Sequence, residues 1–360
     1  MIEFDFALLR ALGLTPAIVN LASSTAAAAE SELHLMRLTE VHRESVRLHD
    51  GARQFSAQAA PRLLRTLAEA DTALAVGDWV LAAPGAEGTA VVHALVPRTN
   101  HLARRDADGR RHPVASHVDT ALLVMGLDDD YNPRRLERYL TLVHASGLQP
   151  VVVLTKADVL AADGVAERVD LLRRRLPPGL EVIAVNAMSP AAATALAAHL
   201  RPGQTLVLLG SSGAGKSTLT NTLLGHAMQD TGAVREHDSR GKHTTTTRSL
   251  FCLPGGACVI DTPGLRALRP DVDEATLASS FADVDALAAG CRFRNCRHVD
   301  EPGCAVRATL DADRLRNFHK LLREARRDTM TVRERQHQIA QWKARGRAGH
   351  ARAKAKRDMA

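Results

Sequence analysis

Hydrophobic and polar positions follow two different patterns along the chain. Over residues 33–96, short alternating segments such as VHRESVRLH, GDWVLAA and TAVVHALV are separated by Gly, Pro and polar residues. Alternation with a period of two is typical of half-buried strands, and this spacing predicts a small antiparallel β-barrel. Residues 1–32 precede it as an extension to which the sequence assigns no function. The charged stretch 104–115, with its Arg-Arg pairs, is predicted to be a linker.

Strands and helices alternate in the middle of the chain, over residues 116–273. The apolar segments TALLVMGL, PVVVLT, EVIAVN, TLVLLG and CVIDTPG are separated by stretches that include amphipathic runs at 133–146 and 164–176. Strands rich in Val, Leu and Ile with helices between them predict an α/β domain, in which helices cover both faces of a mostly parallel sheet. Residues 274–342 are predicted to form a helical domain that ends in a helix from about residue 313.

The composition is that of a globular protein with several domains. The chain has 360 residues, of which 45% are hydrophobic and 24% are charged, close to ordinary usage. No apolar run approaches the roughly 20 residues that cross a bilayer, and the chain begins with Glu3 and Asp5 rather than with positive charge. We expect a soluble cytoplasmic protein with no membrane partner.

The positive charge is concentrated at the end of the chain. The net charge is +7, but residues 314–360 alone carry 15 Lys and Arg against 4 Asp and Glu. Such a concentration favours a polyanionic partner, because cationic side chains release the counterions condensed on phosphates. A solubilising helix followed by a disordered end explains the same charge. The segment 343–360 is expected to be disordered when free.

A phosphate-binding loop follows the fourth of these apolar segments. GSSGAGKS at 210–217 satisfies the GxxxxGK[ST] pattern, with an apolar strand before it and a helix after it. Its glycines allow backbone N–H groups to surround the phosphates, Lys216 reaches the β and γ oxygens, and Ser217 supplies an oxygen to Mg²⁺. The predicted phosphate-site residues are Gly210, Ser211, Ser212, Gly213, Ala214, Gly215, Lys216, Ser217 and Thr218.

Two segments after the phosphate loop are predicted to change conformation with the bound nucleotide. Asp261 and Gly264 of DTPG end a strand, where the carboxylate is predicted to hold Mg²⁺ through water and the glycine N–H to sense the γ-phosphate. Between this motif and the phosphate loop lies GKHTTTTR, in which Thr245 is predicted to complete the Mg²⁺ shell. A Thr-rich edge strand is the alternative for this segment.

A guanine-recognition motif precedes the phosphate loop. Its residues are Thr155, Lys156, Ala157 and Asp158, which match [NT]KxD at the end of the PVVVL strand. Asp158 would accept hydrogen bonds from guanine N1–H and the exocyclic amine, which adenine cannot satisfy, although TKAD is also a possible helix cap. After the next strand, Asn186 and Ala187 are placed beside the base, with the Ala187 N–H on guanine O6. Because base recognition comes before the phosphate loop, the sequence indicates a circularly permuted GTPase.

Three cysteines and one histidine lie within fourteen residues. The spacing Cys291-x₄-Cys296-x-His298-x₅-Cys304 predicts a closed tetrahedral zinc site of the structural kind. The alternative is a group of buried cysteines beside a surface histidine. The loop also carries Arg292, Arg294 and Arg297, which zinc would hold toward phosphate. The remaining two cysteines, Cys252 and Cys258, lie in hydrophobic strand segments and are expected in the core.

These features together resemble the ribosome small-subunit-dependent GTPase A family of bacterial circularly permuted GTPases. The resemblance rests on GSSGAGKS, GKHTTTT, DTPG and CRFRNCRHVDEPGC, is supported by GDWV, LERYL and EPGCAV, and covers about residues 33–322. It implies an OB-fold at 33–103, a permuted P-loop GTPase domain at 116–273 and a zinc-binding domain at 274–342. It further implies binding to the 30S subunit and its 16S rRNA late in maturation, with subunit-stimulated hydrolysis of GTP to GDP and phosphate. The implied cofactors are GTP or GDP, Mg²⁺ and one structural Zn²⁺, and we expect a monomer.

Several positions depart from the family pattern. Thr155 stands where Asn is usual, Asn186 replaces the commoner Ser, and Thr247 stands where His is common. Leu265 follows Gly264, where many GTPases carry the glutamine that orients the attacking water. His243 is the best substitute for that glutamine, so the predicted catalytic residues are His243, Lys216 and Thr245. The alternative role for His243 is contact with rRNA phosphate.

Three other functions remain compatible with these motifs. A large-subunit assembly GTPase shares the permuted order of motifs, and a nucleotide-gated rRNA-binding module with little hydrolysis fits the basic tail and the absent glutamine. An ATPase or P-loop kinase is disfavoured by TKAD. The segment from Lys343 is predicted to contact rRNA without sequence specificity.

Overall fold

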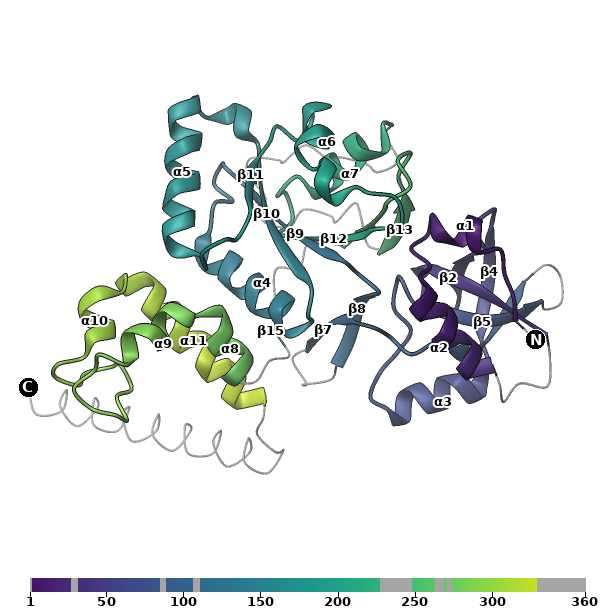
Figure 1. Cartoon of the computed structure of the whole chain (residues 1–360), viewed down its shortest axis with the longest axis horizontal. Helices are drawn as coiled ribbons and strands as arrows, with labels where there is room; N and C mark the ends of the chain where they lie inside the picture. The colour runs from purple at the N-terminus through teal and green to yellow at the C-terminus, as the bar shows by residue number, and fades with distance from the viewer. Residues whose placement is uncertain are drawn as a thin grey trace, which may run out of the picture.

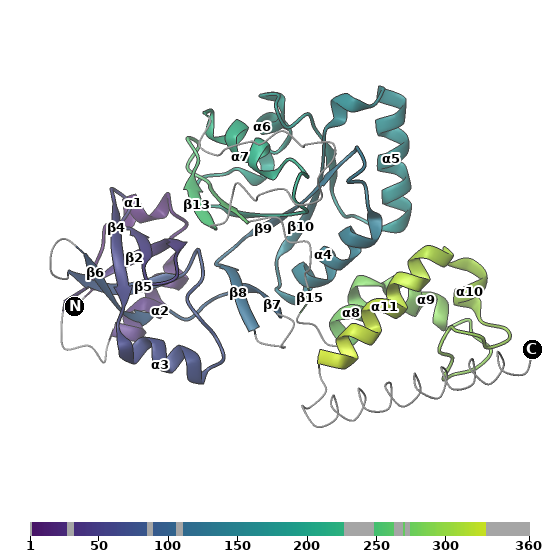
Figure 2. The same cartoon turned by 180° about the vertical axis from the view of Figure 1, so that it is seen from behind.

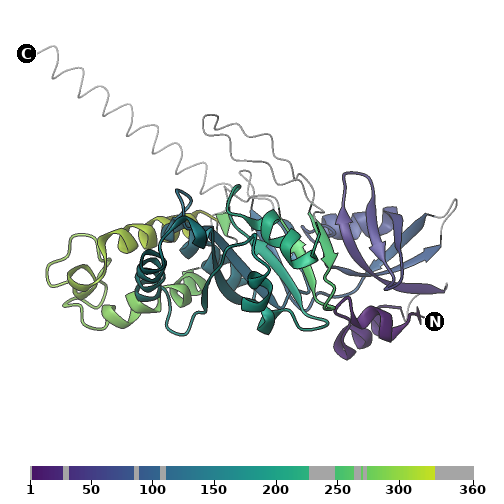
Figure 3. The ribbon, with the colours of Figure 1, turned by 90° about the horizontal axis from the view of Figure 1, so that it is seen from above.

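The computed structural model describes residues 2–26, 32–84, 89–105, 111–226, 248–262, 269–270 and 274–328. Seen from above, the barrel and the C-terminal helices lie at opposite ends of the molecule, with the α/β domain between them (Figure 3). His243, Thr245, Gly264 and the tail at 343–360 lie outside the described residues.

The predicted barrel is closed. Its strands are β2 (Leu33–Val41), β3 (Val46–His49), β4 (Gln54–Ala59), β5 (Trp79–Pro84) and β6 (Ala90–Leu95), with α3 (Pro61–Glu69) between β4 and β5. The pairing runs β2-β3-β4-β6-β5, and β5 pairs back to β2. All pairs are antiparallel except β4 with β6. Closure leaves no long free edge, which removes a site for aggregation.

The N-terminal extension packs on the barrel. It contains β1 (Ile2–Glu3), α1 (Phe6–Arg10) and α2 (Pro16–Ala26), and β1 pairs with β2 in parallel. Leu9, Leu12 and Ala22 are buried in the main hydrophobic cluster. The extension is therefore part of the core rather than an appendage.

A linker is predicted over 104–115, and this prediction is wrong for most of the segment. β7 (His101–Arg105) and β8 (Arg111–Ser116) form an antiparallel pair, and β15 (Arg269–Pro270) adds a third strand beside β7. Leu102, Val114 and Ala115 are fully buried. The arginines hide these strands in the sequence, because they flank short segments whose consecutive residues are all buried, 102–103 in β7 and 113–116 in β8.

The α/β domain has the predicted parallel sheet. Its strands are β9 (Thr120–Gly126), β10 (Gln149–Thr155), β11 (Val182–Ala184), β12 (Thr205–Leu209), β13 (Ser249–Cys252) and β14 (Cys258–Asp261), in the order β11-β10-β9-β12-β14-β13. Among these six described strands, only β13 is antiparallel to its neighbour in the sheet. The helical segments are α4 (Pro133–Ala145), the 3₁₀ turn η2 (Ala157–Val159), α5 (Ala162–Arg175), α6 (Ala191–Ala195), the 3₁₀ turn η3 (Ala197–His199) and α7 (Lys216–Leu224). Both predicted amphipathic helices are thus confirmed, as α4 and α5.

Alternate residues of the central strands face two separate cores. Leu123 and Met125 of β9 belong to the cluster that includes α4, whereas Leu122 and Val124 pack with α6 and α7. Helices cover both faces of the sheet in consequence (Figure 1). The sheet continues into the barrel, since Ser249 of β13 pairs with Glu40 of β2.

A buried arginine joins the extension, the barrel and the α/β domain. Arg37 of β2 donates to the carbonyl oxygens of Leu12, Gly77 (3.2 Å) and His117 (3.0 Å), and to Thr205 Oγ1 at 2.9 Å. Its side chain has no exposed surface. A buried guanidinium must place its donors on acceptors, so these bonds fix how the three parts meet.

The C-terminal helices form a small core of their own beside α4. They are α8 (Glu274–Ser280), α9 (Ala282–Ala288), α10 (Ala305–Thr309) and α11 (Ala312–Asp328). Their cluster includes Leu277, Phe281, Val306 and Leu321. Seen from behind, α8 and α11 lie next to α4 (Figure 2). Among the described residues, no helix combines the length and apolar character that a membrane span requires.

Candidate nucleotide and zinc sites

The loop between β12 and α7 has the backbone that a phosphate cradle requires. Gly213 and Gly215 have φ angles of 84° and 88°, in the left-handed region that glycine enters without steric cost. A Cβ atom at Gly210 would lie 2.4 Å from the carbonyl oxygen of Val124. Glycine at these positions lets the loop turn tightly against β9 and places Gly215 as the N-cap of α7.

Lys216 is held inside this loop. Its Nζ donates to the carbonyl oxygens of Gly210 (3.1 Å) and Ser211 (2.8 Å), and the residue is 6% exposed. Burial lowers the pKa of the Lys216 ammonium, while the nearby carboxylates of Asp261 and Asp130 act to raise it. The Lys216 ammonium therefore lies where phosphate oxygens would replace its contacts with the Gly210 and Ser211 carbonyls.

The two predicted Mg²⁺ ligands in the described part of the chain meet at the start of α7. Ser217 Oγ donates to Asp261 Oδ2 at 3.3 Å, and Asp261 is buried at the end of β14. Thr262 anchors this strand end by donating to the Leu208 carbonyl at 2.6 Å. A hydroxyl and a carboxylate are the hard oxygen donors that Mg²⁺ prefers, so this pair fits the ion.

Thr155 contacts the phosphate loop rather than a base site. Its buried Oγ1 donates to the Ala214 carbonyl at 2.6 Å. A Cβ atom at Gly215 would lie 3.2 Å from Thr155 Oγ1. Lys156 has a left-handed φ of 58°, and its Nζ bonds to Asp128 Oδ2 at 2.5 Å. The first two motif residues thus connect the predicted base-recognition loop to the phosphate loop.

The loops after β10 and β11 meet near α7. The Ala157 N–H donates to the Val185 carbonyl at 3.2 Å, and Thr222 Oγ1 of α7 donates to the Ala187 carbonyl at 2.6 Å. Asn186 Oδ1 accepts from the Met188 N–H at 2.9 Å. Asp158 follows Ala157 and is exposed. The structure therefore brings the predicted base-site segments to one edge of the sheet.

Sequence reasoning missed two carboxylates in the loop after β9. Asp130 Oδ1 accepts from Ser211 Oγ of the phosphate loop at 2.6 Å and from Arg135 Nη2 of α4 at 2.5 Å. For Asp128, burial acts to raise the pKa, but the hydrogen bonds from Lys156 and from the Asp130 N–H lower it overall. The signal was available in GLDDDYN, because the carboxyl ends of such strands are where ligands bind.

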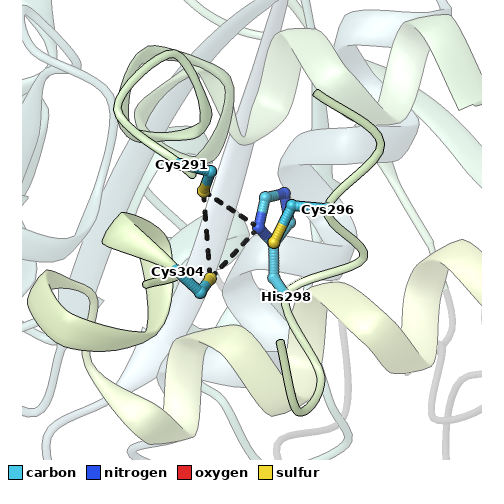
Figure 4. A group of neighbouring side chains, drawn as sticks. All are labelled: Cys291, Cys296, His298 and Cys304. Atoms are coloured by element: carbon cyan, nitrogen blue, oxygen red, sulfur yellow. Dashed lines mark hydrogen bonds between the residues drawn. The ribbon is translucent and has the colours of Figure 1, made fainter. Parts of the chain in front are cut away.

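The four predicted zinc ligands converge in the C-terminal helices. Their ligand atoms all lie within 4.8 Å of one another, and Figure 4 shows the side chains of Cys291, Cys296, His298 and Cys304 turned toward a common centre. His298 Nδ1 is 3.6 Å from Cys291 Sγ and 3.4 Å from Cys304 Sγ, and these two sulfurs are 3.9 Å apart. A tetrahedral site with Zn–S bonds of about 2.3 Å has S···S edges of about 3.8 Å, so the spacing fits Zn²⁺.

The loop around these ligands is shaped by one carboxylate. Glu301 accepts the backbone N–H groups of Arg297 (3.0 Å), Val299 (2.9 Å) and Asp300 (3.2 Å). The backbone N–H of Glu301 itself, followed by those of Arg297 and Val299, lowers the pKa of the Glu301 carboxyl to about 2. His298 sits in the left-handed region with φ 58°. The carboxylate thus holds the turn that presents His298 to the three thiols.

The chain is similar to named GTPases over most of its length. A family model described as RsgA GTPase matches residues 95–270. The Small ribosomal subunit biogenesis GTPase RsgA of Xanthomonas oryzae pv. oryzae (strain MAFF 311018) is 48% identical over 295 residues, 79% of each chain. The protein of the same name from Xanthomonas axonopodis pv. citri (strain 306) is 48% identical over 298 residues, 80% of each.

Two solved structures share the fold. YjeQ from Thermotoga maritima matches with a TM-score of 0.56 and 22% identity over 81% of this chain and 98% of its own. YloQ, described as a circularly permuted GTPase, matches with a TM-score of 0.56 and 21% identity over 85% and 99%. The predicted permuted fold, with its barrel and C-terminal helices, is therefore confirmed. Together with the close relatives, these findings show that the chain belongs to the RsgA GTPase family and is a GTPase.

Proposed function

We propose that this GTPase binds the small (30S) ribosomal subunit and hydrolyses GTP to GDP and phosphate when the subunit stimulates it, late in subunit maturation. The observation that carries the proposal is the 48% identity to proteins named for small-subunit biogenesis, over 79% of the chain. We propose that the protein acts as a cytoplasmic monomer with 16S rRNA as its contact.

Within the nucleotide site, the predicted residues take distinct roles. Asp158 accepts from guanine, with Asn186 and Ala187 beside the base. Ser217 and Asp261 hold Mg²⁺, a role supported by their 3.3 Å contact, and Thr245 completes the shell. Lys216 binds the β and γ oxygens.

His243 is the proposed catalytic group that orients or deprotonates the attacking water. The reason is chemical, since Leu265 cannot polarise water. In His243→Ala, we expect GTP binding to persist while subunit-stimulated turnover is lost. Loss of subunit binding instead would assign this histidine to rRNA contact.

The zinc loop is the proposed rRNA-binding surface in the C-terminal helices. Arg292, Arg294 and Arg297 are all exposed, on a loop that the zinc ligands close. Cationic side chains on a rigid loop bind phosphates with a small entropy cost. Replacing the three with Ala should weaken 30S binding and flatten its salt dependence, with the zinc content unchanged.

The decisive measurement is GTP hydrolysis at fixed ionic strength with no ribosomal subunit, with 30S and with 50S. Lys216→Ala serves as the blank, because its loss removes phosphate binding. Selective stimulation by 30S supports the proposal. Stimulation by 50S alone would identify a large-subunit assembly GTPase, and tight GTP binding without stimulation would identify a nucleotide-gated rRNA-binding module.

A further inference from the structure

The two cysteines outside the zinc site face each other across the β13–β14 hairpin. Cys252 of β13 is the register partner of Cys258 of β14. The hairpin closes with the Leu253 N–H donating to the Ala257 carbonyl at 2.8 Å, and the Cys258 N–H turns away to the Gln204 carbonyl at 2.7 Å. Since hydrogen-bonded and non-hydrogen-bonded pairs alternate along an antiparallel ladder, Cys252 and Cys258 form a non-hydrogen-bonded pair.

This pairing brings the two side chains as close as a sheet allows. Non-hydrogen-bonded partners have Cα atoms about 4.5 Å apart. That separation lies within the roughly 4.4–6.8 Å that a disulfide spans. A bond between Cys252 and Cys258 therefore needs rotation of side chains and no rearrangement of the strands.

The two thiols differ in their access to solvent. Cys252 is exposed, whereas Cys258 is buried. This differs from the expectation that both belong to the core. The side-chain hydrogen bond with Cys258 lowers the pKa of the Cys252 thiol, and the positive charge of Arg37 lowers it further. An exposed thiol of lowered pKa beside a second, buried thiol is the arrangement of a nucleophilic and a resolving cysteine.

The environment of Cys258 suits the role of the resolving thiol. Its Sγ lies 3.6 Å from the Ala11 carbonyl oxygen. The neighbouring Cys252 thiol and burial both raise the pKa of Cys258. The influence of Cys252 disappears once its sulfur is bonded to another sulfur, so capping Cys252 makes Cys258 easier to deprotonate.

We propose that Cys252 and Cys258 form a redox-reactive dithiol that a small disulfide, such as oxidised glutathione, converts into a cross-strand disulfide. The Cys252 thiolate attacks one glutathione sulfur, forms a mixed disulfide and releases one glutathione thiolate. The released thiolate takes the Cys258 proton. Cys258 then attacks the Cys252 sulfur and releases the second glutathione thiolate, which takes up from solvent the proton that Cys252 lost when it ionised. Two protein thiols are oxidised by two electrons, and one glutathione disulfide is reduced to two thiols.

The reaction is separate from the zinc site in sequence and in fold. The hairpin belongs to the α/β domain, whereas the zinc ligands lie at 291–304 among the C-terminal helices. Cys258 lies three residues before Asp261 on β14, about 10 Å along the strand. The dithiol is therefore a modification site on the strand that carries a proposed Mg²⁺ ligand.

Mass spectrometry of the zinc-loaded full chain tests the proposal. The protein is equilibrated in glutathione buffers between about −320 and −180 mV, alkylated and digested with trypsin. Both cysteines fall in one peptide, residues 249–266, between Arg248 and Arg266. In the reducing buffers we expect this peptide to be doubly alkylated. In the oxidising buffers we expect it to be unalkylated, with a mass two hydrogens below that of the reduced, unmodified peptide, while zinc stays bound.

Two variants assign the roles of the thiols. In Cys258→Ala, we expect Cys252 to accumulate as the mixed disulfide with glutathione. In Cys252→Ser, we expect Cys258 to stay reduced. If the wild-type peptide remains doubly alkylated in every buffer, or changes only after zinc is lost or urea is added, the proposal is wrong.

Discussion

Replacing Glu137 with Gln should release the C-terminal helices from the GTPase domain. Glu137 lies on α4 and is 2% exposed. Its carboxylate accepts from Arg175 Nε at 2.5 Å, from Arg314 Nη1 at 2.8 Å and from Asn317 Nδ2. Arg314 and Asn317 belong to α11, so one buried carboxylate binds the two domains together. Gln keeps the shape but removes the charge and places an NH₂ group among donors.

The free-energy cost of this substitution depends on which acidic partners Arg314 and Arg175 keep. Breaking a buried ion pair costs about 3–5 kcal/mol, because the remaining charge stays buried without compensation. Arg314 keeps Asp283, whose oxygens lie at 2.6 and 2.7 Å, and Arg175 keeps Asp313 at 3.0 Å. We therefore expect the lower end, about 3 kcal/mol, which is roughly a 100-fold change in the opening equilibrium.

Hydrogen exchange measures this opening directly. A single global unfolding transition is not expected for a chain of several domains, whereas exchange reports local opening. We expect backbone amides of α11, residues 312–328, to exchange roughly 100-fold faster in Glu137→Gln.

The matched control is Glu274→Gln, which breaks an exposed pair within the C-terminal helices. Arg326 and Glu274 have side chains 58% and 52% exposed, and exposed pairs contribute at most about 1 kcal/mol. If Glu137→Gln changes exchange in α11 no more than Glu274→Gln does, the buried network does not hold the helices in place and the reasoning fails.

Three further predictions concern other sites. Burial, followed by the charge of Arg37, lowers the pKa of His117 to about 4. Its contribution to stability is therefore complete above about pH 6.5 and is lost as the pH falls toward 4, by about 3 kcal/mol. Hydrogen exchange of the β8 amides, corrected for the intrinsic pH dependence of exchange, should show a smaller loss of stability over that range in His117→Asn, and an equal loss in the two proteins would contradict this. Gly210→Ala should abolish GTP binding measured by calorimetry, because its Cβ would lie 2.4 Å from the Val124 carbonyl, and wild-type affinity would show that the loop can shift. Cys296→Ser should lower the zinc content measured by elemental analysis and speed proteolysis of 274–328, whereas retention of one equivalent of zinc would remove Cys296 from the ligand set.

Local motifs account for the predictions that the structure confirms. The phosphate loop and the Cys/His cluster each lie within fifteen residues, so spacing alone restricts which side chains can meet. The amphipathic runs that became α4 and α5 are also local, because a helix repeats every 3.6 residues whatever lies beside it. The permuted order of motifs needed no structure, since it is a property of the sequence itself.

Long-range contacts account for what the sequence did not reveal. Asp130 reaches Ser211 and Glu137 reaches Arg314 across 81 and 177 residues, and no spacing rule relates positions so far apart. The arginines give the strands at 101–105 and 111–116 the character of a charged linker, whereas packing buries consecutive residues on both faces, such as Val114 and Ala115.

The sequence by itself determined the α/β class, the permuted order, the nucleotide motifs and the Cys/His cluster of this chain, because each depends on periodicity, on spacing within a short segment or on the order of such segments. The tertiary structure alone decided that the barrel and the GTPase sheet are continuous through β2 and β13, and that Glu137 joins the domains. It also decided that Cys252 faces Cys258. These facts depend on which faces pack together, and the free energy of packing arises only when distant segments exclude water from one another.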